Sequence, residues 1–185
     1  MMKHLEALGA VELISIAKGI EVSDAMLKKA SVELLYSRVI CPGKYISIIG
    51  GSVSETNDAL QEGLTVGGDL VVDSIYLTNP HFDIMPALAQ ATGVKEVEAL
   101  GIIETFSMCS AIEAADIASK QAEVMLIDVR ISIMLSGKSY ISLTGNLSGV
   151  QSAIDAALAV IEQKGIVVYS VVIPTPREEL HEHII

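Results

Sequence analysis

The run of residues best suited to chemistry is a cysteine followed at once by proline, glycine and lysine. Cys41 carries a thiol, whose deprotonated form binds metals, and the positive charge of Lys44 favours that form. Pro42 removes a backbone donor and Gly43 permits a positive φ, so the chain is expected to turn sharply after the sulfur. A free cysteine is more often a small buried apolar residue, and from the residues alone both interpretations of Cys41 remain open.

Other residues that resemble parts of chemical motifs do not complete them. The run Gly137-Lys138-Ser139 matches the end of a phosphate-binding loop, but Ser132 stands where the first glycine of that loop is required. His81 has no serine, cysteine or aspartate at a diagnostic spacing, and His181 and His183 are assigned to a polar tail. The sequence also has no nucleophile elbow and no dinucleotide-binding glycine pattern. We therefore expect that the protein is not an enzyme.

The composition predicts a chain that folds around a substantial core. Of its 185 residues, 51% are hydrophobic and 19% are charged, and the net charge of -11 opposes binding to a nucleic-acid backbone. Every apolar run is interrupted well before the ~18 residues that a membrane span needs. Two cysteines cannot build a disulfide framework and the first residues lack a secretory apolar stretch, so a cytoplasmic protein without membrane or nucleic-acid partners is expected. With only 4% aromatic residues, the apolar excess indicates subunit interfaces.

The sequence is an internal duplication. Residues 8–38 align with residues 100–130 without a gap, and after Arg130 the second copy carries two extra residues before Gly137-Lys138, which matches Gly43-Lys44. The identical pairs in the ungapped part are Leu8/Leu100, Gly9/Gly101, Glu12/Glu104, Ser15/Ser107, Ile20/Ile112, Glu21/Glu113, Asp24/Asp116, Lys28/Lys120, Ala30/Ala122, Val32/Val124, Leu34/Leu126 and Arg38/Arg130. The repeats cover about 8–80 and 100–176, which predicts a first domain at 1–91, with a linker from about 78, and a second at 92–185.

Each repeat has the pattern of strand, helix, two strands, helix and strand. The first strands are expected at 11–17 and 102–108, and the helix of the first repeat carries a buried stripe that includes Val22 and Met26. The second helix of the second repeat is expected to follow a capping box from Ser148 to Gln151. The fold class is therefore α/β of the α+β kind: two fused ferredoxin-like units, each an antiparallel sheet with helices on one face.

These residues resemble bacterial microcompartment (BMC) shell domains, over nearly the whole chain and twice. The resemblance rests on VELISIAKGIEVSDAMLKKASVELL, on its second copy, and on the closing VVYSVVIPTP. It implies a structural shell protein, with the domain in its ordinary strand order, that forms a homotrimer of six-lobed outline and tiles with other BMC shell proteins. Lys28 and Lys120 occupy the position of the family's tile-edge lysine.

The segment ICPGK is similar to tandem members of propanediol-utilisation compartments, which carry one cysteine per subunit at the threefold axis. This resemblance implies that Cys41 is a metal ligand, that one [4Fe-4S] cluster is held per trimer, and that the cluster transfers electrons to a redox protein of the lumen or cytosol. Pro42, Gly43 and Lys44 would line the central pore together with Ser136, Gly137 and Lys138.

Two other functions are compatible with the same sequence. One is a cluster-free shell trimer with a metabolite pore, and the other is a regulatory oligomer that binds a small molecule between subunits. Cys109 is expected to be a core residue in every case, because the first repeat has Ala17 at the same position.

Overall fold

The computed structural model describes residues 5–130 and 137–184, which form two compact units. The first unit contains residues 5–80 with Gly137, and the second contains residues 81–130 and 138–184. Among the residues described, no helix is long and apolar enough to span a membrane.

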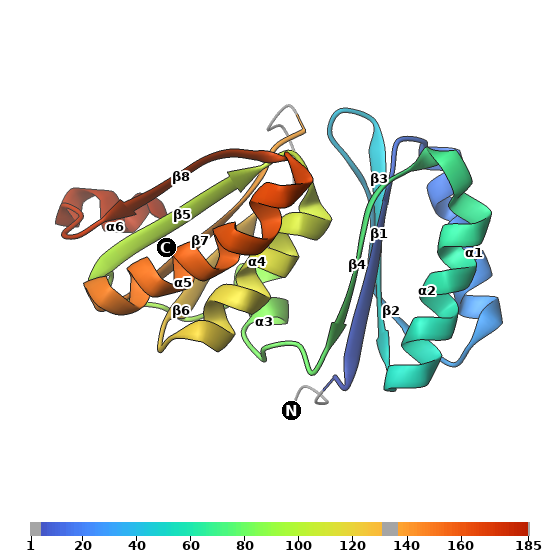
Figure 1. Ribbon diagram of the computed structural model, residues 1–185, viewed down its shortest axis with the longest axis horizontal. Coiled ribbons are helices and arrows are strands. Elements are labelled where there is room, and N and C mark those ends of the chain that lie inside the picture. The colour runs from blue at the N-terminus through green and yellow to red at the C-terminus, as the bar shows by residue number, and fades with distance from the viewer. Residues whose placement is uncertain (1–4, 131–136, 185) are drawn as a thin grey trace. The chain divides into compact units, whose positions relative to one another are not determined.

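The first unit is a four-stranded antiparallel sheet with two helices on one of its faces (Figure 1). The order of strands across the sheet is β2-β3-β1-β4, so the first strand is central. The elements are β1 (Ala7–Leu13), α1 (Ile16–Lys29), β2 (Glu33–Ile40), β3 (Lys44–Gly51), α2 (Val53–Gly67) and β4 (Val71–Thr78).

The second unit repeats this arrangement with strand order β6-β7-β5-β8 and adds a short helix at each end. The elements are α3 (Ile84–Leu88), β5 (Ala99–Thr105), α4 (Met108–Gln121), β6 (Met125–Arg130), β7 (Ser139–Gly145), α5 (Leu147–Ile161), β8 (Val167–Ile173) and α6 (Glu178–Ile184). The predicted fold class, two antiparallel units with helices on one face, is confirmed.

The first strand lies four residues earlier than its sequence pattern indicates in the first repeat, and three residues earlier in the second. Ser15 accepts a hydrogen bond from the backbone N–H of Lys18, and Ser107 accepts one from Ser110. Both serines are helix N-caps, so the residues that follow them are helical rather than extended. The predicted strands at 11–17 and 102–108 were therefore wrong in position, although right in number and order.

The predicted capping box at Ser148 and Gln151 is also wrong. Asn146 caps α5 by accepting a hydrogen bond of 2.8 Å from the backbone N–H of Gly149, while Gln151 donates instead to Asp155 within the helix. The apolar face of α5 is buried where it was expected. The residues that form it are Val150, Ala153, Ile154, Ala157 and Ile161.

Equivalent apolar residues of α1 and α4 differ in burial. Ile20 on α1 is 56% exposed, whereas Ile112 at the same position of α4 is 0% exposed. Ile16 and its counterpart Met108 differ in the same direction. In the single chain, the apolar side of α1 that includes Ile20 is therefore exposed to solvent. We call it the bare apolar side of α1.

Candidate functional site

The loop between β2 and β3 presents Cys41 at a tight turn. The last pair of the ladder joins Ile40 to Lys44, and the backbone N–H of Gly43 donates a 3.0 Å hydrogen bond to the Ile40 carbonyl. Gly43 has φ of +86°, and no described atom lies within 4 Å of the point where a Cβ would stand. Cys41 is half-buried and Pro42 is exposed. The predicted sharp turn after the sulfur is thus present, with open space among the described residues at Gly43, whereas Pro42 lies close to Gly137.

Lys44 is bound to a buried carboxylate on the neighbouring strand. Its Nζ atom lies 2.7 Å from Oε1 of Glu12, and the Glu12 side chain is 1% exposed while that of Lys44 is 16% exposed. The sequence suggested that the Lys44 ammonium favours the thiolate of Cys41. In the structure this ammonium forms its ion pair with the Glu12 carboxylate. Sequence reasoning did not pick out Glu12 as a site residue, although its identity with Glu104 and the repeated Gly-Lys pair were the signal for it.

The loop of the second repeat has the same anchor without a thiol. Lys138 lies 2.7 Å from Glu104, but these side chains are 37% and 32% exposed. Gly137 has φ of +88°, which matches Gly43. Ser136, the other predicted pore residue of this loop, lies outside the described residues.

A buried network of hydroxyl groups supports the other side of the first hairpin. The Tyr45 hydroxyl lies 2.8 Å from Oγ of Ser37, which in turn contacts Ser23 and Ser47. Ser23 also donates a hydrogen bond of 2.7 Å to the Gly19 carbonyl on α1. The counterparts of Ser23, Ser37 and Ser47 in the second repeat are Ala115, Val129 and Ile141. The hairpin that carries Cys41 therefore has a hydroxyl network where the second repeat has apolar side chains.

The two predicted tile-edge lysines have different surroundings. Lys28 pairs with Asp24, and both side chains are mostly exposed. Lys120 pairs at 2.7 Å with Asp116, whose side chain is buried and also accepts a 2.8 Å hydrogen bond from the backbone N–H of His81. Only Lys28 of these two is largely open to solvent in the single chain.

Cys109 and the two C-terminal histidines lie in helices of the second unit. Cys109 is fully buried in α4, as expected for a core residue. His181 and His183 lie in the helix α6, which corrects their assignment to an irregular tail. Among the described residues, no group of three or more His, Cys, Asp and Glu side chains is arranged to hold a metal ion.

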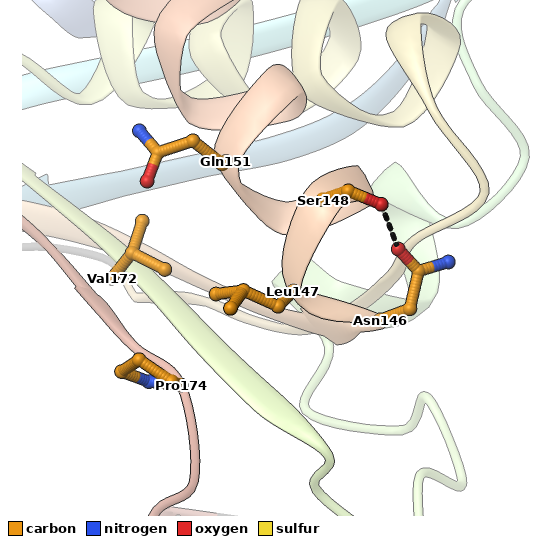
Figure 2. Close-up of a pocket in the computed structure, with 6 residues that line it drawn as sticks. All are labelled: Asn146, Leu147, Ser148, Gln151, Val172 and Pro174. Carbon is orange, nitrogen blue, oxygen red and sulfur yellow. Dashed lines mark hydrogen bonds between the residues drawn. The ribbon is translucent and has the colours of Figure 1, made fainter.

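Two cavities among the described residues of the second unit differ in their polar lining. The one beside the start of α5 is lined by residues without ionisable groups, as Figure 2 shows. There Oγ of Ser148 donates a 2.8 Å hydrogen bond to Oδ1 of Asn146, the capping residue, so the polar groups at this helix start already have partners. A cavity of about 300 Å³ on the second sheet is lined by Glu104, which pairs with Lys138, and by His183 of α6.

Comparisons with known proteins agree with this arrangement. Residues 7–80 and 99–176 each match the BMC domain. The chain is 42% identical to the bacterial microcompartment shell protein PduT of Citrobacter freundii, over 95% of each chain, and 28% identical to the carboxysome assembly protein CcmO of Synechococcus elongatus, over 96% of this chain and 68% of that one. A crystal structure of a microcompartment protein from Desulfitobacterium hafniense superposes with a TM-score of 0.86 at 42% identity, over 96% of this chain and 99% of that one. The chain therefore belongs to the BMC-domain family of bacterial microcompartment shell proteins, as a member with two domains in tandem.

Proposed function

We propose that three copies of this chain form a pseudohexameric shell tile that holds one [4Fe-4S] cluster at its threefold axis and passes electrons across the shell. Each copy would contribute the thiolate of Cys41. The observation that carries this proposal is the position of Cys41 at an anchored turn, next to Gly43, whose surroundings are open among the described residues. A tip of this kind can approach its symmetry mates without rearranging the sheet.

The donor set fits a cluster that is shared between chains. Such clusters are held by cysteine thiolates and normally take four ligands, whereas this chain offers one thiol at the loop. Threefold symmetry multiplies that thiol to three, and the remaining iron takes a ligand other than cysteine. The bound cluster would supply one-electron transfer.

The trimer is supported by the bare apolar side of α1. Ile20 is exposed in the single chain although its counterpart Ile112 is buried, so a second copy has an apolar surface to cover. A contact between two different surfaces closes into a ring when the rotation fits, and two domains per chain make three copies equivalent to six lobes.

The partners that follow are other BMC shell proteins at the tile edges and a redox protein of the lumen or cytosol. Lys28 is exposed on α1 and available for an edge contact. PduT and CcmO are named for a microcompartment shell and for carboxysome assembly, which supports a location in a compartment shell.

Anaerobic purification tests the cluster. The wild type should show broad charge-transfer absorption near ~400 nm with bound iron and sulfide, and Cys41→Ser should be a colourless trimer of unchanged size. Cys109→Ala is the matched control and should keep the absorption. A wild type that stays colourless after reconstitution with iron and sulfide would refute the cluster and leave a metabolite pore as the function of the trimer.

A further inference from the structure

We propose that Glu12 and Lys44 are positioning residues, which fix the root of the Cys41 turn and set the local charge beside the group that the thiolates bind. This inference rests on the proposed function, because it assigns a role toward the cluster. The geometry of the ion pair itself is independent of that function.

The place of Lys44 in the hairpin makes it suited to this role. Lys44 is the first residue of β3 after the turn and pairs with Ile40, the last residue of β2. Its ammonium group reaches across to Glu12 on β1, the strand next to β3 in the sheet. The ion pair therefore ties the root of the turn to a central strand.

The residue after Lys44, Tyr45, makes contacts on the opposite face of the hairpin. Successive side chains of a strand point to opposite faces, so Tyr45 lies on the helix side. There its ring covers Gly19, where an added Cβ would stand 2.4 Å from a ring carbon, and its hydroxyl bonds to Ser37. Lys44 and Tyr45 together leave the turn little freedom to tilt.

Because the Glu12 carboxylate is buried, it depends on its ion pair with Lys44. A carboxylate that is 1% exposed has lost nearly all its hydration, so removing its ammonium partner leaves a buried charge without this ion pair. The equivalent pair between Glu104 and Lys138 has the same separation but is about one-third exposed, and water can replace either partner. The chain thus contains its own control pair, in a loop without a thiol.

The charges of the pair predict opposite effects on the reduction potential. The potential of an iron-sulfur cluster depends on net charge and hydrogen bonding around it. Removing the carboxylate charge in Glu12→Gln leaves Lys44 positive and should raise the potential. Removing the ammonium in Lys44→Met should lower the potential at alkaline pH, where Glu12 stays ionised despite its burial, while the double variant should return close to the wild type.

The decisive experiment measures iron retention and reduction potential of the anaerobic trimer in these three variants. Each single variant should lose roughly tenfold in cluster affinity, the low end of the range for residues that support a metal ligand, because the pair holds the root of the turn rather than the thiol itself. Glu104→Gln and Lys138→Met, the controls, should retain iron and shift the potential much less. Shifts of the same sign in both single variants, or shifts as large in the controls, would overturn the inference.

A second measurement separates this inference from the cluster itself. In the cluster-free background of Cys41→Ser, thermal unfolding of the single and double variants gives the coupling between Glu12 and Lys44. We expect a stronger coupling than for Glu104 and Lys138, because the first pair is more buried. Absence of that difference overturns the positioning role even if the wild type holds iron, whereas a wild type without iron refutes the cluster and the effect on its potential.

Discussion

Nζ of Lys44 lies 2.7 Å from Oε1 of Glu12, and the same separation recurs between Lys138 and Glu104 in the second repeat. The duplication has therefore kept one anchored hairpin in both halves of the chain. The halves differ in the loop next to this ion pair, since Cys41 precedes the first Gly-Lys pair and the second loop has no thiol. The metal chemistry that we propose is an addition to a shared structural unit.

Replacing Gly43 by alanine should loosen the site without unfolding the chain. The φ of +86° is unfavourable for an L-residue and costs about 1 kcal/mol, but a Cβ would meet no described atom. Gly165→Ala is the matched control, with φ of +67° and equally open space. Chemical denaturation should show a similar loss of stability in both variants, and iron analysis should show a lower content only in Gly43→Ala. Equal iron in the two variants would count against a role for the turn.

A charge on the bare side of α1 should prevent assembly. Ile20→Glu places a carboxylate on the apolar surface that we assign to a second copy, where it would be buried without a partner. Light scattering should give three times 19.6 kDa for the wild type and a single chain for the variant. Val160→Glu, at an exposed apolar position of α5, is the control and should remain trimeric. Trimeric Ile20→Glu would show that this side of α1 is not an interface.

Cys109→Ala should affect stability but not metal content. Its side chain is fully buried in α4, so removal of the sulfur leaves a small cavity and costs about 1 kcal/mol, at the low end for core truncations. The trimer should keep its iron because Cys109 is not part of the Cys41 loop. Denaturant midpoints and iron analysis on the same preparation check both points, and loss of iron with an intact trimer would contradict the assignment.

The fold could be predicted because its signals are local and occur twice. The β-branched strands, the buried stripe with Val22 and Met26 and the internal alignment all agree on one topology. The positions of the first strands could not be predicted, since the apolar pattern continues through Ser15 and only the cap ends the strand. Asn146 was missed as a cap because Ser148 and Gln151 offered a more familiar pattern.

The site could be predicted only where its residues are adjacent in the sequence. Cys41, Gly43 and Lys44 are adjacent in sequence, so their turn was expected. The partner of Lys44 is Glu12, which lies 32 residues earlier and meets it through the pairing of β1 with β3. The contrast between exposed Ile20 and buried Ile112 is likewise invisible in two identical residues, because it comes from packing in three dimensions.

We expect the stability of the second unit to depend on pH through Asp128. Burial raises the pKa of this carboxyl above its ordinary value of 3.8, although nearby Arg130 acts in the opposite direction. The folded state therefore binds the proton more tightly than the unfolded chain, so the contribution of Asp128 to stability falls as pH rises from about 3.8 through the folded pKa. Thermal unfolding from pH 4 to 7 should show the wild type losing stability relative to Asp128→Asn. A relative gain with rising pH would show that Arg130 outweighs burial.

Native mass spectrometry of the anaerobically purified protein tests the central claim most directly, because it counts chains and clusters in one particle. The account predicts three chains with one unit of four irons and four sulfides, and in Cys41→Ser the same three chains without it. Trimers of the wild type that carry no such unit after reconstitution, or that carry one unit for every chain, would contradict a single cluster shared at the threefold axis.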